Sequence, residues 1–194
     1  SREFYLNKQI IGFIGTGNMA ESMIRGLTAI EPESRELWAT DIDDTRLAYI
    51  ADNYDVVPKS LEAIAKGTDD IILAVKTQTI ELVLTNLANH IRQEKQLIIS
   101  IAAGVTTSQS ERQCGANLSV VRCMPNTPAM IGFGATGLFA NEQVSLKQRQ
   151  EADSILKILG INAWVENEDK IDVITAISGI GPAYFLLFIE ALQD

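Results

Sequence analysis

Three glycines separate a short apolar run from a helical pattern near the start of the chain, in QIIGFIGTGNMAESMIRGL at residues 9–27. Residues 15–20 have the spacing Gly-x-Gly-x-x-Ala, with which a strand, a tight turn and a helix bind a dinucleotide. The first glycine makes the turn, the second lets the backbone approach a pyrophosphate, and the small third residue packs helix against strand. Glycines also form tight turns without any ligand, so the motif alone leaves a purely structural turn as the alternative.

An acidic residue after the next apolar run favours the dinucleotide interpretation. Asp41 lies where a carboxylate accepts hydrogen bonds from a ribose 2′-hydroxyl, which favours NAD(H). A 2′-phosphate would meet Asp41, Asp43 and Asp44 there, and Arg35 and Arg46 are the cations that would offset this charge. Aspartates at this place also commonly cap the following helix, and both roles are compatible.

Short apolar runs alternate with helical patterns in the first part of the chain. Nearly continuous β-branched runs indicate strands that are covered on both faces, at residues 10–14, 36–40, 70–75, 96–100 and 119–123. Apolar residues recur with helical spacing between them, at residues 20–27, 47–54 and 80–91. The alternation predicts an α/β fold with a doubly wound, mostly parallel sheet whose ligand-binding loops share one edge.

The pattern changes after residue 123. The sequence MPNTP indicates a loop, residues 132–140 and NAWVE indicate two further strands, and residues 152–159 have a helical face. Ser108 and Glu111 have the spacing of a capping box. From about Asp169 one long helical pattern with an apolar stripe follows, interrupted by SGIGP at residues 178–182. We therefore expect a dinucleotide-binding domain at residues 1–167 and the start of a helical domain at residues 168–194.

Composition narrows the classes of function. The chain has 194 residues, a net charge of −9 and no basic run, which disfavours a nucleic-acid partner. It has neither a membrane-length apolar run nor a visible secretory signal, and we expect a cytoplasmic protein. Cys114 and Cys123 form no CxxC pair and His90 is the single histidine, so we expect no disulfide framework and no metal site. A Ser-His-Asp triad lacks its GxSxG elbow.

Four further stretches, together with the glycine turn, resemble one enzyme family. They are LAVKTQ at 73–78, ISIAAGVT at 99–106, VRCMPNTP at 121–128 and SGIGPAYFLLFIEAL at 178–192. In order and spacing the chain resembles Δ1-pyrroline-5-carboxylate reductase, without most of that family's C-terminal helical domain and its Ser-Pro-Gly-Gly-Thr-Thr segment. The resemblance implies a Rossmann-type domain followed by the start of an all-helical dimerisation domain. It also implies a homodimer or larger homo-oligomer that reduces 1-pyrroline-5-carboxylate to L-proline with NADPH or NADH, the last step of proline biosynthesis.

The resemblance also implies site residues by position. It gives as cofactor-binding residues Ile14, Gly15, Thr16, Gly17, Asn18, Met19, Asp41, Ala74, Val75, Lys76, Ala102 and Ala103. On the substrate side it gives Asn126, Thr127 and Glu168. It assigns no catalytic acid or base, because an imine protonates to an electrophilic iminium without a strong acid. Backbone amides at SGIGP either bind the substrate carboxylate at a helix N-terminus or belong to a simple Gly-Pro kink.

Two positions depart from the family pattern, with Thr77 in place of a proline and Ile180 in place of a serine. Two other functions stay open at this point. A β-hydroxyacid-type dehydrogenase also joins a nucleotide-binding and a helical domain, but it needs a catalytic lysine in the helical domain, where this chain has only Lys170. A protein that binds NAD(P) without turnover is the other alternative.

Overall fold

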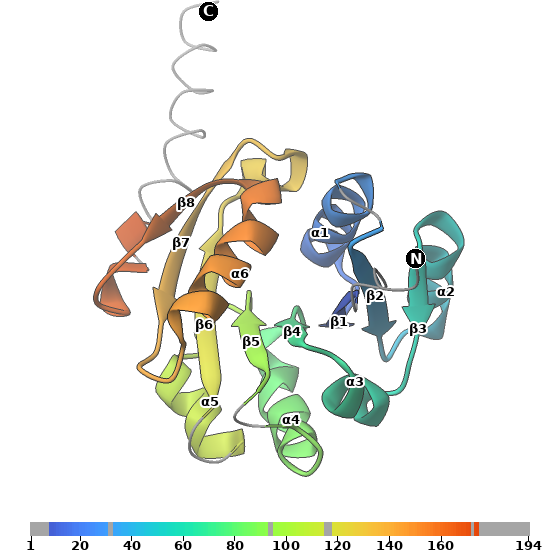
Figure 1. Ribbon diagram of the computed structural model, residues 1–194, viewed down its shortest axis with the longest axis horizontal. Coiled ribbons are helices and arrows are strands. Elements are labelled where there is room, and N and C mark those ends of the chain that lie inside the picture. Colours follow the sequence, from blue (N-terminus) through green and yellow to red (C-terminus); the bar gives the residue numbers. More distant parts are fainter. Residues whose placement is uncertain (1–7, 31–32, 93–94, 115–117, 172, 175–194) are drawn as a thin grey trace, which may run out of the picture.

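The computed structural model describes residues 8–30, 33–92, 95–114, 118–171, 173 and 174 (Figure 1). The SGIGP segment, with Ile180, and the apolar stripe after it lie outside these residues. The elements are β1 (Gln9–Ile14), α1 (Asn18–Ala29), β2 (Arg35–Thr40), α2 (Asp44–Asn53), β3 (Val56–Pro58), α3 (Leu61–Gly67), β4 (Asp70–Leu73), α4 (Thr77–Ala88), β5 (Leu97–Ser100), α5 (Thr107–Cys114), β6 (Ser119–Pro125), η1 (Thr127–Ile131), β7 (Gly134–Ala140), α6 (Leu146–Leu156), η2 (Lys157–Leu159) and β8 (Gly160–Trp164).

The strands of the described residues form one eight-stranded sheet in the order β3-β2-β1-β4-β5-β6-β7-β8. Every neighbouring pair is parallel except β6 and β7, which pair antiparallel, so the predicted mostly parallel sheet is confirmed. The strand order reverses between β1 and β4. Ligands of doubly wound sheets bind at such a switch point, outside the carboxyl ends of the strands.

Helices cover both faces of the sheet, and each face has its own hydrophobic core (Figure 1). Ile11 and Phe13 of β1 pack with α1, α2 and α6 on one face. Ile71 and Leu73 of β4 pack with α3, α4 and α5 on the other face. Side chains alternate between the faces of a strand, and this explains why the covered strands have nearly continuous apolar sequences.

One short strand and one helix start differ from the sequence prediction. Sequence reasoning missed β3, because three residues are too few to show a period. The helical stretch that it placed before Gly67 is α3. The predicted capping box at Ser108 and Glu111 is wrong. The backbone amide of Gln109 donates to the Thr106 hydroxyl at 3.2 Å, and the Thr106 amide donates to Oε1 of Gln109 at 2.8 Å, so the box lies two residues earlier.

Candidate functional site

Gly15 brings the turn after β1 against the loop after β4. Its φ of +92° is in the left-handed region that favours glycine, and an added Cβ would lie 2.7 Å from the carbonyl oxygen of Ala74. The amide of Ala74 also donates to the carbonyl of Ile14 at 2.9 Å. The fold itself therefore requires glycine at position 15, and two of the predicted cofactor segments meet at the switch point.

Gly17 has no such structural requirement. Its φ of −64° suits any residue, and a Cβ built there meets nothing within 4 Å. Gly17 is the N-cap of α1 and offers no side chain to the free amides of the helix, whereas Asp43 and Ser60 cap α2 and α3. No side chain therefore covers the backbone amides at the position where the fingerprint places a pyrophosphate, and the turn fits a dinucleotide.

Asp41 holds the glycine turn. One oxygen of its carboxylate accepts hydrogen bonds from the amide and the hydroxyl of Thr16, both at 2.6 Å. The other oxygen accepts from the amide of Asp43 at 3.0 Å. Burial alone would raise the pKa of Asp41, but these hydrogen bonds outweigh it and lower the pKa, so the carboxylate is charged at neutral pH. Asp43, and not Asp41, caps α2, because its side chain accepts hydrogen bonds from the amides of Thr45 and Arg46.

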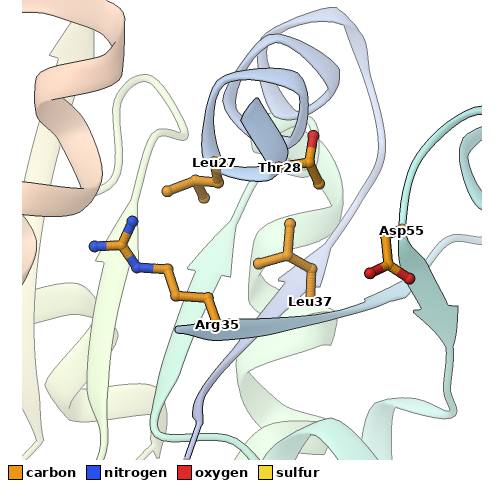
Figure 2. A pocket seen from close by; sticks show the side chains of 5 residues that line it. All are labelled: Leu27, Thr28, Arg35, Leu37 and Asp55. Carbon is orange, nitrogen blue, oxygen red and sulfur yellow. The ribbon is translucent and has the colours of Figure 1, made fainter. Parts of the chain in front are cut away.

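Of the two arginines expected near the ribose, Arg46 lies in the first turn of α2 and Arg35 lies at the amino end of β2. Arg46 reaches the glycine turn, where its Nε donates to the carbonyl of Thr16 at 2.7 Å and its Nη2 pairs with Glu21 at 2.5 Å. Arg35 begins β2 and donates to Gln9 and Ser154. Its side chain lines a small hollow of about 20 Å³ at the amino end of β2 and points away from Asp55 (Figure 2). Arg35 therefore cannot offset charge at Asp41.

A hydroxyl links the loops after β4 and β5. Oγ1 of Thr77 donates to the carbonyl of Ala103 at 2.8 Å. Proline at this position would have no such donor, so the departure from the family pattern adds a contact between two predicted cofactor segments. Ala102 is buried, whereas Ala103 and Lys76 are exposed.

The predicted substrate residues lie in different settings. Thr127 is exposed at the start of η1, and the Asn126 side chain accepts from the amide of Ala135 at 3.0 Å. Both carboxylate oxygens of Glu168 accept from Thr107, at 2.9 Å from its amide and 2.9 Å from its hydroxyl. Glu168 also pairs with the buried Arg122 at 3.4 Å. Glu168 thus ties the start of α5 to β6, and its carboxylate is already engaged within the chain.

Sequence reasoning missed the contributions of Glu21 and Arg122. An acidic residue in the first turn of a phosphate-facing helix was one available signal, because its charge opposes an anion. An arginine inside an apolar strand was the other, because a buried guanidinium needs an acidic partner.

The remaining cavity and the two cysteines of the described residues add no reactive group to the carboxyl edge of the sheet. A hollow of about 680 Å³ lies at the opposite, amino edge, between strand starts such as Gln9 and Leu97 and α6 residues such as Glu151.

Burial raises the pKa of the Cys114 thiol to about 12 and raises that of Cys123 as well, so neither is a reactive nucleophile. Within the described ranges no acidic, cysteine and histidine side chains cluster as a metal site, and no helix is long and apolar enough to cross a membrane.

Comparison with known proteins gives two family matches. Residues 10–104 match the family described as NADP oxidoreductase coenzyme F420-dependent. Residues 168–194 match the family described as pyrroline-5-carboxylate reductase dimerisation. The second match covers the segment that the sequence pattern assigned to a helical domain.

Individual relatives agree with these matches. The chain is 45% identical to the pyrroline-5-carboxylate reductase of Pseudomonas aeruginosa, over 95% of this chain and 67% of that protein. A solved pyrroline-5-carboxylate reductase from Coxiella burnetii is similar with a TM-score of 0.91 and 40% identity, over 96% of this chain and 70% of that one. The pyrroline carboxylate reductase of Plasmodium falciparum, solved with NADP bound, is similar with a TM-score of 0.77 and 28% identity. This similarity covers 95% of this chain and 68% of that one.

Proposed function

The chain belongs to the pyrroline-5-carboxylate reductase family, and we propose that it reduces 1-pyrroline-5-carboxylate to L-proline, the last step of proline biosynthesis. Family membership carries the choice of substrate. The observation that carries the cofactor site is the open space at Gly17 beside the Asp41–Thr16 contact at the switch point of the sheet. The protein's own packing explains Gly15 but gives no reason for a glycine at position 17. A ligand that needs backbone approach gives that reason.

The residues at the carboxyl edge define how a reduced NADH or NADPH would be held. Residues 14–19 would surround the pyrophosphate, Asp41 would face the ribose, and the segments 74–76 and 102–103 would contact the remaining part of the dinucleotide. When bound, the cofactor supplies the hydride that the C=N carbon of the cyclic imine accepts. The chain itself orients the two reactants and excludes water. We further propose that Asp41 gives NADH the advantage over NADPH.

The substrate side is proposed at Asn126 and Thr127, at the carboxyl end of β6. The helix α1 lies beside them, because Arg25 donates to the carbonyl of Met130 in η1 at 2.8 Å. Glu168 enters this proposal as a positioning residue, since its carboxylate holds Thr107 and Arg122. The second reactant would thus lie on the α1 side of the switch point.

We divide the chain into a nucleotide-binding domain at residues 1–167 and the start of a dimerisation domain at residues 168–194, and propose a cytoplasmic homodimer or larger homo-oligomer. The family match at 168–194 supports this division. The chain spans about two thirds of the length of the relatives it matches. Family membership argues against the alternative that the chain is a β-hydroxyacid dehydrogenase. That alternative would need Lys170 as its catalytic lysine, and the side chain of Lys170 is exposed.

The activity is tested by mixing the protein with NADH or NADPH and 1-pyrroline-5-carboxylate and following the absorbance of the reduced nicotinamide. The proposal predicts oxidation of the cofactor that depends on the imine, with L-proline as the product. Cofactor binding without any oxidation would instead assign this chain to the proteins that bind NAD(P) without turnover.

A further inference from the structure

Glu21 occupies the first turn of α1, where its charge acts directly on any phosphate bound to the glycine turn. Its carboxylate accepts hydrogen bonds from Nη2 of Arg46 at 2.5 Å, from the hydroxyl of Tyr54 at 2.9 Å and from that of Tyr49 at 3.4 Å. Burial alone would raise the pKa of Glu21, but the bonds from Arg46 and Tyr54 lower it, so Glu21 is charged at neutral pH. Arg46 neutralises a negative charge that would otherwise repel a pyrophosphate.

Arg46 has no freedom to serve a second anion in this arrangement. Its Nε donates to the carbonyl of Thr16, and its guanidinium lies 5.2 Å from the centre of the Tyr49 ring. Only 26% of its side chain is exposed. The planar fork of an arginine matches a phosphate bidentately, but here the fork is directed at Glu21 and Thr16.

The acidic residues near the ribose oppose a 2′-phosphate. Lys59, whose amide donates to the carbonyl of Ala39 in β2, holds its ammonium group 4.9 Å from the centre of the Trp38 ring. Asp41 stands at the end of β2, and Asp43 and Asp44 follow it at the start of α2. The intervening Ile42 is 97% exposed and contributes no charge. Arg35, the cation of β2, lies at the far end of the strand.

We propose that Glu21 acts together with Asp41 in setting the nucleotide preference of this chain, by holding Arg46 away from the ribose 2′ position. The inference rests on the proposed function only in requiring that a dinucleotide binds at the glycine turn. The Glu21–Arg46 pair leaves the pyrophosphate site nearly neutral and usable by NADH. It also withholds the one cation of α2 that a 2′-phosphate needs, so NADPH gains nothing from its additional charge.

The test measures equilibrium dissociation constants of ADP and 2′,5′-ADP by calorimetric titration, because these fragments differ only in the position of one phosphate and report no turnover. The variants are Glu21→Gln, Arg46→Gln and the double variant. Glu151→Gln is the matched control, because it removes one acidic charge from an i,i+4 ion pair on α6 at the opposite edge of the sheet. Circular dichroism checks that each variant is folded.

We expect Glu21→Gln to bind 2′,5′-ADP about 10-fold more tightly and ADP only slightly more tightly, because Arg46 is released toward phosphate. Arg46→Gln exposes the charge of Glu21 and weakens both nucleotides by a similar factor. The double variant binds ADP about as the unchanged protein does and shows no gain for 2′,5′-ADP. Glu151→Gln leaves the ratio of the two dissociation constants unchanged.

An unchanged ratio in Glu21→Gln would overturn the inference. A selective loss of 2′,5′-ADP affinity in Arg46→Gln would also overturn it, because Arg46 would then already serve the 2′-phosphate. This second variant keeps the inference testable if Glu21→Gln does not fold. Failure of the unchanged protein to bind ADP, NADH and NADPH contradicts the proposed function instead, so the two failures are distinguishable.

Discussion

The carboxylate of Asp41 accepts two hydrogen bonds of 2.6 Å from Thr16, one from its backbone amide and one from its hydroxyl, and they fix the glycine turn to the end of β2. Thr16 is fully buried, so its amide and hydroxyl have no access to solvent as an alternative partner. A residue that general rules assign to the ribose therefore also holds the phosphate turn in place. Loop geometry and nucleotide affinity should consequently change together when Asp41 is replaced.

Replacing Asp41 with asparagine tests this double role. One amide oxygen cannot accept from both Thr16 and the Asp43 amide, and a buried donor left without a partner costs about 1–3 kcal/mol. We expect the free energy of unfolding to fall by about 1–2 kcal/mol and NADH affinity to fall about 5-fold or more. Urea unfolding and NADH fluorescence titration measure the two effects.

The control for this variant is Asp43→Asn. Asparagine caps a helix about as well as aspartate, so the unfolding free energy should change by less than about 0.5 kcal/mol. Equal destabilisation by the two variants would show that Asp41 has no special role in holding the turn.

Substitutions at Thr77 test the hydrogen-bonded contact between the loops after β4 and β5. Thr77→Val keeps the shape of the side chain but removes the donor to Ala103, and we expect NADH to bind about 2- to 5-fold more weakly. Thr77→Ser keeps the hydroxyl and should bind within about 2-fold of the unchanged protein. If the serine and valine variants have the same affinity, the hydroxyl does not position these loops.

Asp70 makes the stability of the chain depend on pH. Burial raises its pKa from 3.8 to about 7, with a hydrogen bond from Gln9 at 2.6 Å acting against the rise. The folded state then binds the proton more tightly than the unfolded state, so stability is lost as pH rises from about 4 to about 7. For a shift of this size the loss is at most about 4 kcal/mol.

The variant Asp70→Asn removes this dependence, because its amide oxygen still accepts from Gln9 and carries no charge. We expect Asp70→Asn to exceed the unchanged protein in unfolding free energy at pH 8 and to match it near pH 4. Asp52→Asn, at an exposed position, changes the net charge equally, and its unfolding free energy should not diverge from that of the unchanged protein in this way. Urea midpoints measured across this pH range decide the outcome, and parallel curves for Asp70→Asn and the unchanged protein would contradict it.

The sheet was predictable because its central strands are buried on both faces. Residues 10–14 and 96–100 have a mostly apolar run that leaves no solvent face, and the structure places almost all of them in β1 and β5. The capping box was not predictable in the same way, because Thr106–Gln109 and Ser108–Glu111 overlap and both have a suitable spacing. Only the path of the chain after β5 decides between them.

The glycine turn and Asp41 were predictable because they follow a known motif, not because they are close in sequence. The glycine turn needs only a strand, a turn and a helix in succession, and its partner Asp41 follows the next strand. The Glu21–Arg46 and Glu168–Arg122 pairs join residues 25 and 46 positions apart. Such pairings have no local period, so the sequence shows the charges but not which of them meet.

Gly17→Ala, compared with Gly15→Ala, tests most directly whether the glycine turn exists for a ligand. The Cβ at position 17 meets no atom of the chain, so we expect Gly17→Ala to keep or slightly raise the unfolding free energy. Gly15→Ala should lose about 2–4 kcal/mol through its positive φ and its contact with Ala74. The deciding measurement is the NADH dissociation constant of folded Gly17→Ala. We predict that it rises at least about 10-fold, because the methyl group occupies the space that the pyrophosphate needs. An unchanged dissociation constant would contradict the assignment of this turn as the cofactor site.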